Sequence, residues 1–348
     1  GALMGGAWGA AVGLLLSGWA LRRARAAAVL GALGGPALGI LGALYRFYAT
    51  PMVFAFDHCF GYFAGTVYDT ELGGLSTLVT FRGGTLLGLL TAAAGASLLR
   101  REGRALALVA APPRGRCALV ALGAAGTIAH ALGGAQLGHW STAGSIAREL
   151  GGRLAAERCE VLHDAAIASD RARLVLRECE AHVRELEAFW GTRAAARIRV
   201  FLFASAEQKG RLMGATRTQI AKPWRAEIYL EQAPYPHPVL RHELAHVVAG
   251  SFGVGPFRVA GPLGGWLPDP GRIEGVAEAS APDDDGELTL AQWARAMRDL
   301  GQLPRLGEVF RLSFLGHGAA KAYTTAGAFT AWLAETHGAE ALDRKSVV

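Results

Sequence analysis

The sequence is poor in cysteine and in charged residues. Its 348 residues include four cysteines, and no two of them have the Cys-x-x-Cys spacing of a structural zinc site. Charged residues make up only 18% of the chain and hydrophobic residues 51%, which is too apolar for an ordinary soluble enzyme. These shortages exclude a cysteine-based metal site and a small disulfide scaffold, and they predict membrane segments.

The positive net charge of +6 does not indicate a nucleic-acid-binding protein. The basic residues are mostly arginines, and they cluster between apolar runs instead of along one amphipathic face. Such clusters act as topology signals in membrane proteins. We therefore expect a lipid bilayer as a partner and no nucleic acid. The sequence leaves the oligomeric state open.

Two features stay open. Cys159 and Cys179 can pair if their part of the chain lies outside the cytoplasm, and unpaired thiols fit the sequence at least as well. The first residue is Gly1 and not Met. The sequence is thus compatible with a fragment of a longer protein.

The first third of the chain holds long hydrophobic runs. Four of them are near the length that a helix needs to cross a bilayer. They cover residues 2–21, 26–45, 83–99 and 117–135. We expect an N-terminal bundle of about four transmembrane helices over residues 1–136.

Arginines set the orientation of this bundle. They lie at 22–25, directly after the first run, and at both ends of the segment 100–116. The positive-inside rule places these two arginine-rich segments in the cytoplasm. Everything after about residue 136 is then extracytoplasmic, in what we expect to be a bacterial cytoplasmic membrane. A fifth span at 47–68 would move the arginines of 100–104 to the outer side, so we reject it. A signal peptide at 2–21 is disfavoured because the second run follows too closely.

The loop over residues 46–82 is rich in aromatic residues. An aromatic belt at the membrane–water boundary is the favoured interpretation. The alternative is a polar-aromatic site at the membrane face, with Asp57 and His58 as metal ligands in its boldest form.

Residues 143–348 have the pattern of a soluble α+β domain. Residues 143–157 read as a polar helix or linker. Apolar periodicity then predicts alternating strands and helices. The strands are expected at 160–163, 197–203 and 224–230, the helices at 168–190 and 205–213, and a third helix ends near Gly250. Helices dominate afterwards, at 271–280, 289–300, 305–310 and 319–337.

The third helix carries His242-Glu243-Leu244-Ala245-His246. Two histidines four apart lie on one face of a helix and can bind one metal ion together. The glutamate between them can take a proton from a water molecule at that metal. An amphipathic core helix with incidental histidines is the alternative.

A catalytic zinc site needs a third protein ligand. Glu274 is the best candidate, because a helix that begins near Asp269-Pro270 presents Glu274 and Glu278 on one face. Glu274 would bind the metal, and Glu278 would hold a histidine ring from outside. Two exposed helix charges are the alternative.

The His-Glu-Leu-Ala-His motif followed by Glu274-Gly275-Val276-Ala277-Glu278 resembles the gluzincin metallopeptidases, especially the peptidase MA-like group. The order of strands and helices before the motif is similar as well. The resemblance covers residues 157–340 and implies a zincin-like fold, a zinc cofactor and Glu274 as the third ligand. The family often has Trp-Leu shortly before this glutamate, whereas an extra Pro-Asp-Pro-Gly segment follows Trp266-Leu267 here.

Farther on, residues 321–329 resemble a downstream helix of these enzymes, in which a tyrosine faces the site. The resemblance makes Tyr323 the candidate for stabilising the oxyanion, with His317 in reserve. A buried tyrosine that packs against Trp332 explains the residue equally well. Strand 224–230 is a candidate edge strand for an extended peptide.

These patterns predict a membrane-anchored, extracytoplasmic zinc peptidase that acts on peptides or proteins. One alternative is a catalytically silent zincin-like domain that binds or assembles other proteins. Intramembrane proteolysis is a second alternative, but the surroundings of the motif are too polar and the apolar run too short.

Overall fold

A computed structural model describes residues 9, 24–64, 75–102, 105–281 and 288–338. The chain divides into two compact units. Unit 1 comprises residues 1–146 and 210–216, and unit 2 comprises residues 147–209 and 217–348.

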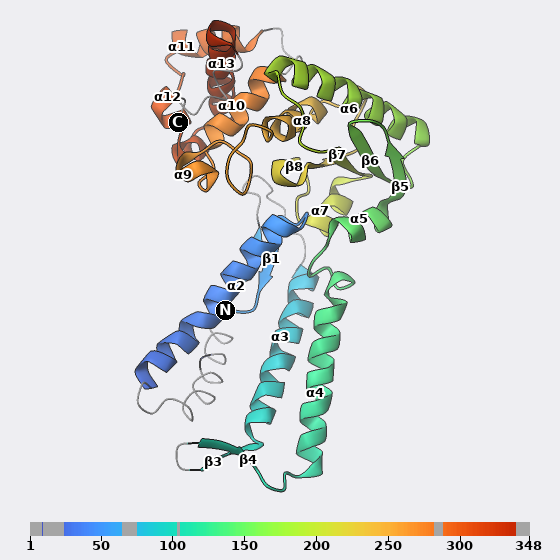
Figure 1. Ribbon diagram of the computed structural model, residues 1–348, viewed down its shortest axis with the longest axis vertical. Coiled ribbons are helices and arrows are strands. Elements are labelled where there is room, and N and C mark those ends of the chain that lie inside the picture. The colour runs from blue at the N-terminus through green and yellow to red at the C-terminus, as the bar shows by residue number, and fades with distance from the viewer. Residues whose placement is uncertain (1–8, 10–23, 65–74, 103–104, 282–287, 339–348) are drawn as a thin grey trace. The chain divides into compact units, whose positions relative to one another are not determined.

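Unit 1 consists of long helices and short hairpins (Figure 1). Helices α3 (Leu75–Ala96) and α4 (Arg114–Leu132) pack side by side. Strands β1 (Phe54–Asp57) and β2 (Gly61–Ala64) form one antiparallel hairpin, and β3 (Leu99–Glu102) and β4 (Ala105–Leu108) form a second. The remaining elements of this unit are helix α2 (Ala24–Ala49) and the short 3-10 turn η1 (Gly133–Ala135).

The prediction of four spanning helices is confirmed in part. Among the described residues, two helices are long and apolar enough to cross a membrane, Ser76–Ala96 and Arg114–Ala135. Helix α2 covers the predicted run 26–45 and is not one of these two; it contains Pro36 and has Arg46 in its last turn. The predicted run 2–21 falls outside the described residues, apart from Gly9.

The described part of the aromatic loop contains a hairpin and a small core. Phe56 stacks on Phe81 of α3 at 5.2 Å between ring centres, in a small core of buried aromatic residues. Asp57 closes the β1–β2 turn, because its Oδ1 accepts the backbone N–H groups of Cys59 (2.7 Å) and Phe60 (2.6 Å). His58 Nδ1 lies 2.8 Å from Thr85 Oγ1. Neither Asp57 nor His58 belongs to a three-ligand metal group in the described part of the chain.

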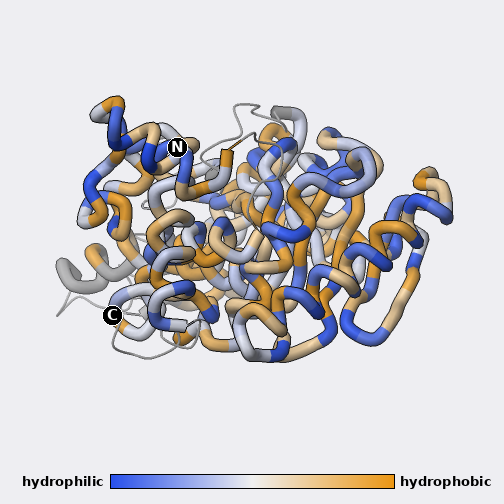
Figure 2. The backbone as a smooth tube through the Cα atoms, turned by 90° about the horizontal axis from the view of Figure 1, so that it is seen from above, coloured by the Kyte–Doolittle hydropathy of each residue, from blue (hydrophilic) through white to orange (hydrophobic). Residues whose placement is uncertain are grey.

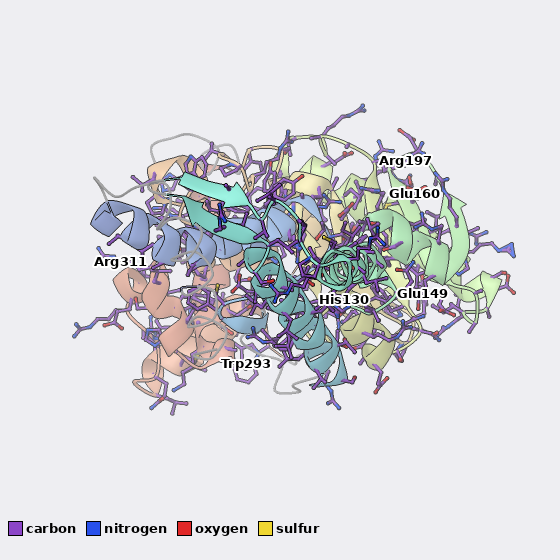
Figure 3. The ribbon with its side chains drawn as sticks, turned by 90° about the horizontal axis from the view of Figure 1, so that it is seen from below. His130, Glu149, Glu160, Arg197, Trp293 and Arg311 are labelled. Atoms are coloured by element: carbon purple, nitrogen blue, oxygen red, sulfur yellow. A yellow bond between two sulfur atoms is a disulfide. The ribbon has the colours of Figure 1, made fainter. Side chains whose placement is uncertain are left out.

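Unit 2 is built on a five-stranded mixed sheet with the order β5-β6-β7-β9-β8. Its strands are β5 (Gly151–Ala155), β6 (Cys159–Asp164), β7 (Ile198–Phe203), β8 (Ile220–Lys222) and β9 (Glu227–Glu231). Strands β6, β7 and β9 are parallel, and the two outer strands run antiparallel to their neighbours. Figure 3 shows Glu160 of β6 near Arg197, which precedes β7, as this pairing requires.

The sheet differs from the prediction at both edges. Residues 143–157 contain helix α5 (Ala143–Leu150) and then the edge strand β5. The predicted strand 224–230 is β9, which lies inside the sheet, and β8 is the edge strand on that side. Residues Pro223–Arg225 form the 3-10 turn η2 between them. A three-residue strand is too short for alternation to show in the sequence.

Helices pack on this sheet and on one another. Helix α6 (Ser169–Trp190) is amphipathic, and hydrophilic and hydrophobic residues alternate along the helices of the unit (Figure 2). It ends at Gly191, whose φ of 61° is the left-handed conformation expected of a glycine C-cap. The other described helices of this unit are the first half of α7 (Ala206–Met213), then α8 (Leu240–Ala249), α9 (Pro262–Gly265), α10 (Pro270–Ser280), α11 (Leu290–Asp299), α12 (Leu306–Val309), η3 (Leu312–Gly316) and α13 (Ala319–His337).

A disulfide joins Cys159 of β6 to Cys179 of α6, with 6.3 Å between the Cα atoms. Both cysteines are fully buried in the core between the sheet and α6. Their partners in this core include Leu240 and Leu244 of α8. Of the two arrangements that the sequence left open, the structure has the disulfide, and α8 is anchored in the same core.

Candidate metal centre

The histidines of the motif lie on the face of α8 that is turned away from the core. Leu240, Leu244 and Val248 are spaced by four residues and are fully buried, so this face holds the helix against the sheet and α6. The opposite face presents His242 and His246 to α10. The 3.6-residue period of the helix thus separates the packing face from the ligand face.

Glu274 of α10 completes a three-residue group with the two histidines. Its Oε2 lies 3.3 Å from Nε2 of His242 and 3.4 Å from Nε2 of His246. The two Nε2 atoms are 3.2 Å apart. All three donor atoms lie within 4.8 Å of one another, and the described residues contain no other such group.

This donor set fits zinc. Two imidazole nitrogens and one carboxylate oxygen are a known catalytic zinc set, which leaves a coordination position open. Ligand atoms about 2.0–2.2 Å from a zinc ion are roughly 3–3.5 Å from one another in tetrahedral geometry, which matches the three observed separations. Glu278 Oε1 lies 3.4 Å from the other nitrogen, Nδ1, of His242. A carboxylate in that position orients a ligating ring.

Charges at the site are strongly coupled. Burial lowers the pKa of His242, but hydrogen bonds to Glu274 and Glu278 outweigh it and raise the pKa to about 10. Burial acts to raise the pKa of Glu274, yet the charge of His246 and hydrogen bonds to both histidines hold it well below its usual range. The site therefore pairs an anionic carboxylate with cationic imidazole, and a metal ion would take the place of those protons.

Glu243 is buried, with 8% of the residue exposed. Burial raises its pKa above the usual value, and the charges of His246 and His242 oppose the rise. A carboxylate with a raised pKa beside a metal site is suited to accept a proton and give it back.

Two glycines allow α10 and α13 to approach each other closely. A Cβ atom on Gly275 would lie 2.6 Å from Thr330 Oγ1, and one on Gly327 would lie 2.5 Å from Cβ of Glu278. Both contacts are too short for a side chain. Gly275 directly follows Glu274, so this packing fixes α10 at the residue that faces the histidines.

The same packing brings Tyr323 of α13 to the histidines. Its ring lies 6.4 Å from that of His242 and 5.4 Å from that of Phe314. Trp332, the packing partner considered from the sequence, stacks on Phe329 instead. His317 Nε2 lies 3.7 Å from Glu308 Oε2. Tyr323 is thus adjacent to a ligand ring, while its role stays a prediction.

Two further residues position the centre: Arg241, which sequence reasoning missed, and Asp269, which it placed at the start of the helix. Arg241 joins three helices, because its Nε donates to the carbonyl of Ser280 at 3.1 Å and its Nη1 lies 3.0 Å from Glu185 Oε2 of α6. Asp269 caps α10 by accepting the N–H of Arg272 at 3.3 Å. The Asp-Pro pair is a readable start signal, but no local signal marks the long-range contacts of Arg241.

Comparisons with known proteins do not assign the chain to a family. No protein-family model matches it, and no curated protein matches it either. The structure by itself supports a candidate His-His-Glu metal site in an α+β unit, together with two helices of membrane-spanning length among the described residues.

Proposed function

We propose that the chain is a membrane-anchored zinc peptidase of the gluzincin kind. The observation that carries the proposal is the group of His242, His246 and Glu274, with Glu243 on the same helix. A fortuitous cluster would not require a carboxylate behind a ligand ring, yet Glu278 lies 3.4 Å from His242 Nδ1.

In this mechanism the two histidines and Glu274 hold the zinc. Zinc would supply a Lewis acid and lower the pKa of water. The Glu243 carboxylate takes a proton from the attacking water and passes it to the leaving amine. Glu278 keeps the His242 ring in one orientation. The Tyr323 hydroxyl is the candidate donor to the developing oxyanion.

The edge strand β8 offers a place for an extended substrate. It pairs with β9 on one side only and packs against α8. An extended peptide can add to such an edge through main-chain hydrogen bonds. The proposal thus moves the substrate contact from residues 224–230 to residues 220–222. Replacement of Ala221 by Pro, which would remove a backbone donor, should raise KM; an unchanged KM would exclude this pairing.

The disulfide supports an extracytoplasmic position for unit 2. Disulfides persist in oxidising compartments and are rare in the cytosol. Cys159–Cys179 is buried in the core that also holds α8. The disulfide therefore belongs to the core against which the helix with the two histidines packs. This agrees with the orientation inferred from the arginines.

The decisive experiment measures zinc content and peptide hydrolysis on the purified full chain, with Glu243→Gln and Glu274→Gln alongside. We expect about one zinc per chain, and a loss of about 10²- to 10⁴-fold in activity for Glu243→Gln with zinc retained. Glu274→Gln should lose zinc as well. Clearly less than one zinc per parent chain, after zinc loading, would overturn the site.

A silent zincin-like domain is the second candidate. It predicts bound zinc and no hydrolysis in either the parent or Glu243→Gln. The buried, pKa-shifted Glu243 argues against it, because a binding domain has no need for an ionisable group there. Intramembrane proteolysis is disfavoured, since α8 has only 10 residues and packs within the α+β unit.

A further inference from the structure

The segment between the two ligand-bearing helices exposes several large apolar side chains. In the stretch Val259–Pro268 there is no charged residue. Leu263 is 72% exposed, Trp266 67% and Leu267 53%. Val254 is exposed as well. We call these four residues the apolar tip; Leu263 lies in the short turn α9 (Pro262–Gly265) (Figure 1).

The apolar tip has a fixed conformation. Leu263 has a φ of 54°, a left-handed conformation that leucine rarely adopts. A Cβ atom on Gly265 would lie 2.3 Å from the carbonyl oxygen of Val254, so the backbones at these two residues lie in close contact. Val254 and Val259 form a β-bridge at its base. The fold thus holds large apolar side chains in solvent, against their solvation preference.

We propose that the apolar tip inserts into the membrane–water interface of the bilayer in which the chain is anchored. Tryptophan and leucine in an uncharged stretch such as residues 259–268 are the composition of interfacial insertion. The inference rests on the membrane anchoring in the proposed function, and it does not depend on peptidase activity.

The connection between the second candidate span and unit 2 is short, which keeps unit 2 close to the bilayer. The second candidate span ends at Ala135 and unit 2 begins at Ala147, 12 residues later. Even fully extended, these residues reach at most about 40 Å, roughly the diameter of a domain of this size. Where this helix spans the bilayer, unit 2 is therefore tethered close to the membrane surface. A soluble protein has no such permanent proximity, and a cover formed by a second copy of the chain is an outcome of the test below.

The test is the depth of a nitroxide label on the full chain in phosphatidylcholine–phosphatidylglycerol vesicles. Cys59 and Cys117 are free and are first replaced by serine. The label is then placed at Leu263→Cys. Leu300→Cys is the matched control, because Leu300 is 75% exposed and lies in the same unit. Glu243→Gln is included in all chains, so that hydrolysis plays no part.

We expect the label at 263 to lie about 5–10 Å below the headgroup level, accessible to oxygen and shielded from a water-soluble nickel chelate. The label at 300 should be open to the chelate. Equal chelate access at both positions would overturn the inference, and so would a label at 263 that is shielded from both reagents, which would mean a protein cover. Leu267→Cys repeats the test if the strained position 263 does not tolerate a cysteine.

Alkaline extraction of the same vesicles separates this inference from the proposed function. If the chain stays in the membrane pellet while the label at 263 remains in water, only the insertion of the tip is refuted. If the chain is released, the membrane anchoring is refuted, and the inference fails with it. Zinc content and hydrolysis are measured independently of both outcomes.

Discussion

Lys222 gives the sharpest test of the energetics of unit 2. Its side chain is fully buried at the end of β8, with Nζ 5.6 Å from the ring centre of Trp224. Burial lowers its pKa from the ordinary 10.5 to about 7; the charge of Arg225 adds to this decrease, and Glu227 opposes it. We predict that Lys222→Met stabilises the protein, and more so at pH 7 than at pH 9.

The sign follows from proton linkage. Between pH 7 and 10.5 the unfolded chain binds a proton at Lys222 that the folded chain does not, so stability falls as the pH is lowered through this window. One pH unit corresponds to about 1.4 kcal/mol, which gives about 2–3 kcal/mol between pH 9 and pH 7. Methionine has a similar length and no charge, and it removes this dependence.

The assay is thermal unfolding of the detergent-solubilised chain at pH 7 and pH 9. The melting-temperature advantage of Lys222→Met over the parent should be larger at pH 7 by roughly 5–10 °C. Lys321→Met, on the partly exposed α13, controls for removal of a lysine as such. An advantage that is the same at both pH values would refute the reasoning, because it would mean that Lys222 does not exchange a proton in this range.

The remaining predictions concern the metal centre and its support. Glu278→Gln should weaken zinc affinity or activity by about 10- to 100-fold, measured by competition with a chelator; an unchanged affinity and activity would deny Glu278 its role behind His242. Zinc binding at pH 7 should release a proton from His242, whose pKa is raised to about 10, and calorimetry in buffers of different ionisation enthalpy detects it; above pH 10 the release should vanish. Gly275→Ala should lower zinc content, because the new methyl group would meet Thr330 at 2.6 Å; full zinc content would show that α13 can move away. Replacing Cys159 and Cys179 by serine should cost about 3 kcal/mol for a 20-residue separation, seen as a lower melting temperature, and an unchanged melting temperature would contradict the chain-entropy account.

Much of unit 2 could be predicted from sequence because its elements have strong periodic signals. Helix α6 was expected at 168–190 and spans Ser169–Trp190, and α13 has the expected bounds 319–337. Strand β5 was missed because its residues alternate weakly in burial and follow a polar helix. The edge strand was misplaced because β8 has only three residues.

The membrane part was predicted less well. The third apolar run was expected at 83–99, but α3 begins at Leu75, since Arg82 does not end the helix. Arg82 instead donates from Nη1 to the carbonyl of His58 at 2.6 Å. The side chain of Arg82, which the sequence presents as a boundary, thus makes a hydrogen bond that local sequence does not show.

The sequence by itself determined the composition of the metal site. The spacing of His242 and His246 places them on one helix face, and this follows from helix geometry alone. Tertiary structure decided which distant residues meet them. Glu274 reaches both histidines because Gly275 and Gly327 let α10 and α13 pack closely. Such contacts depend on how the surfaces of two helices fit together, so the periodicity of either helix alone does not predict them.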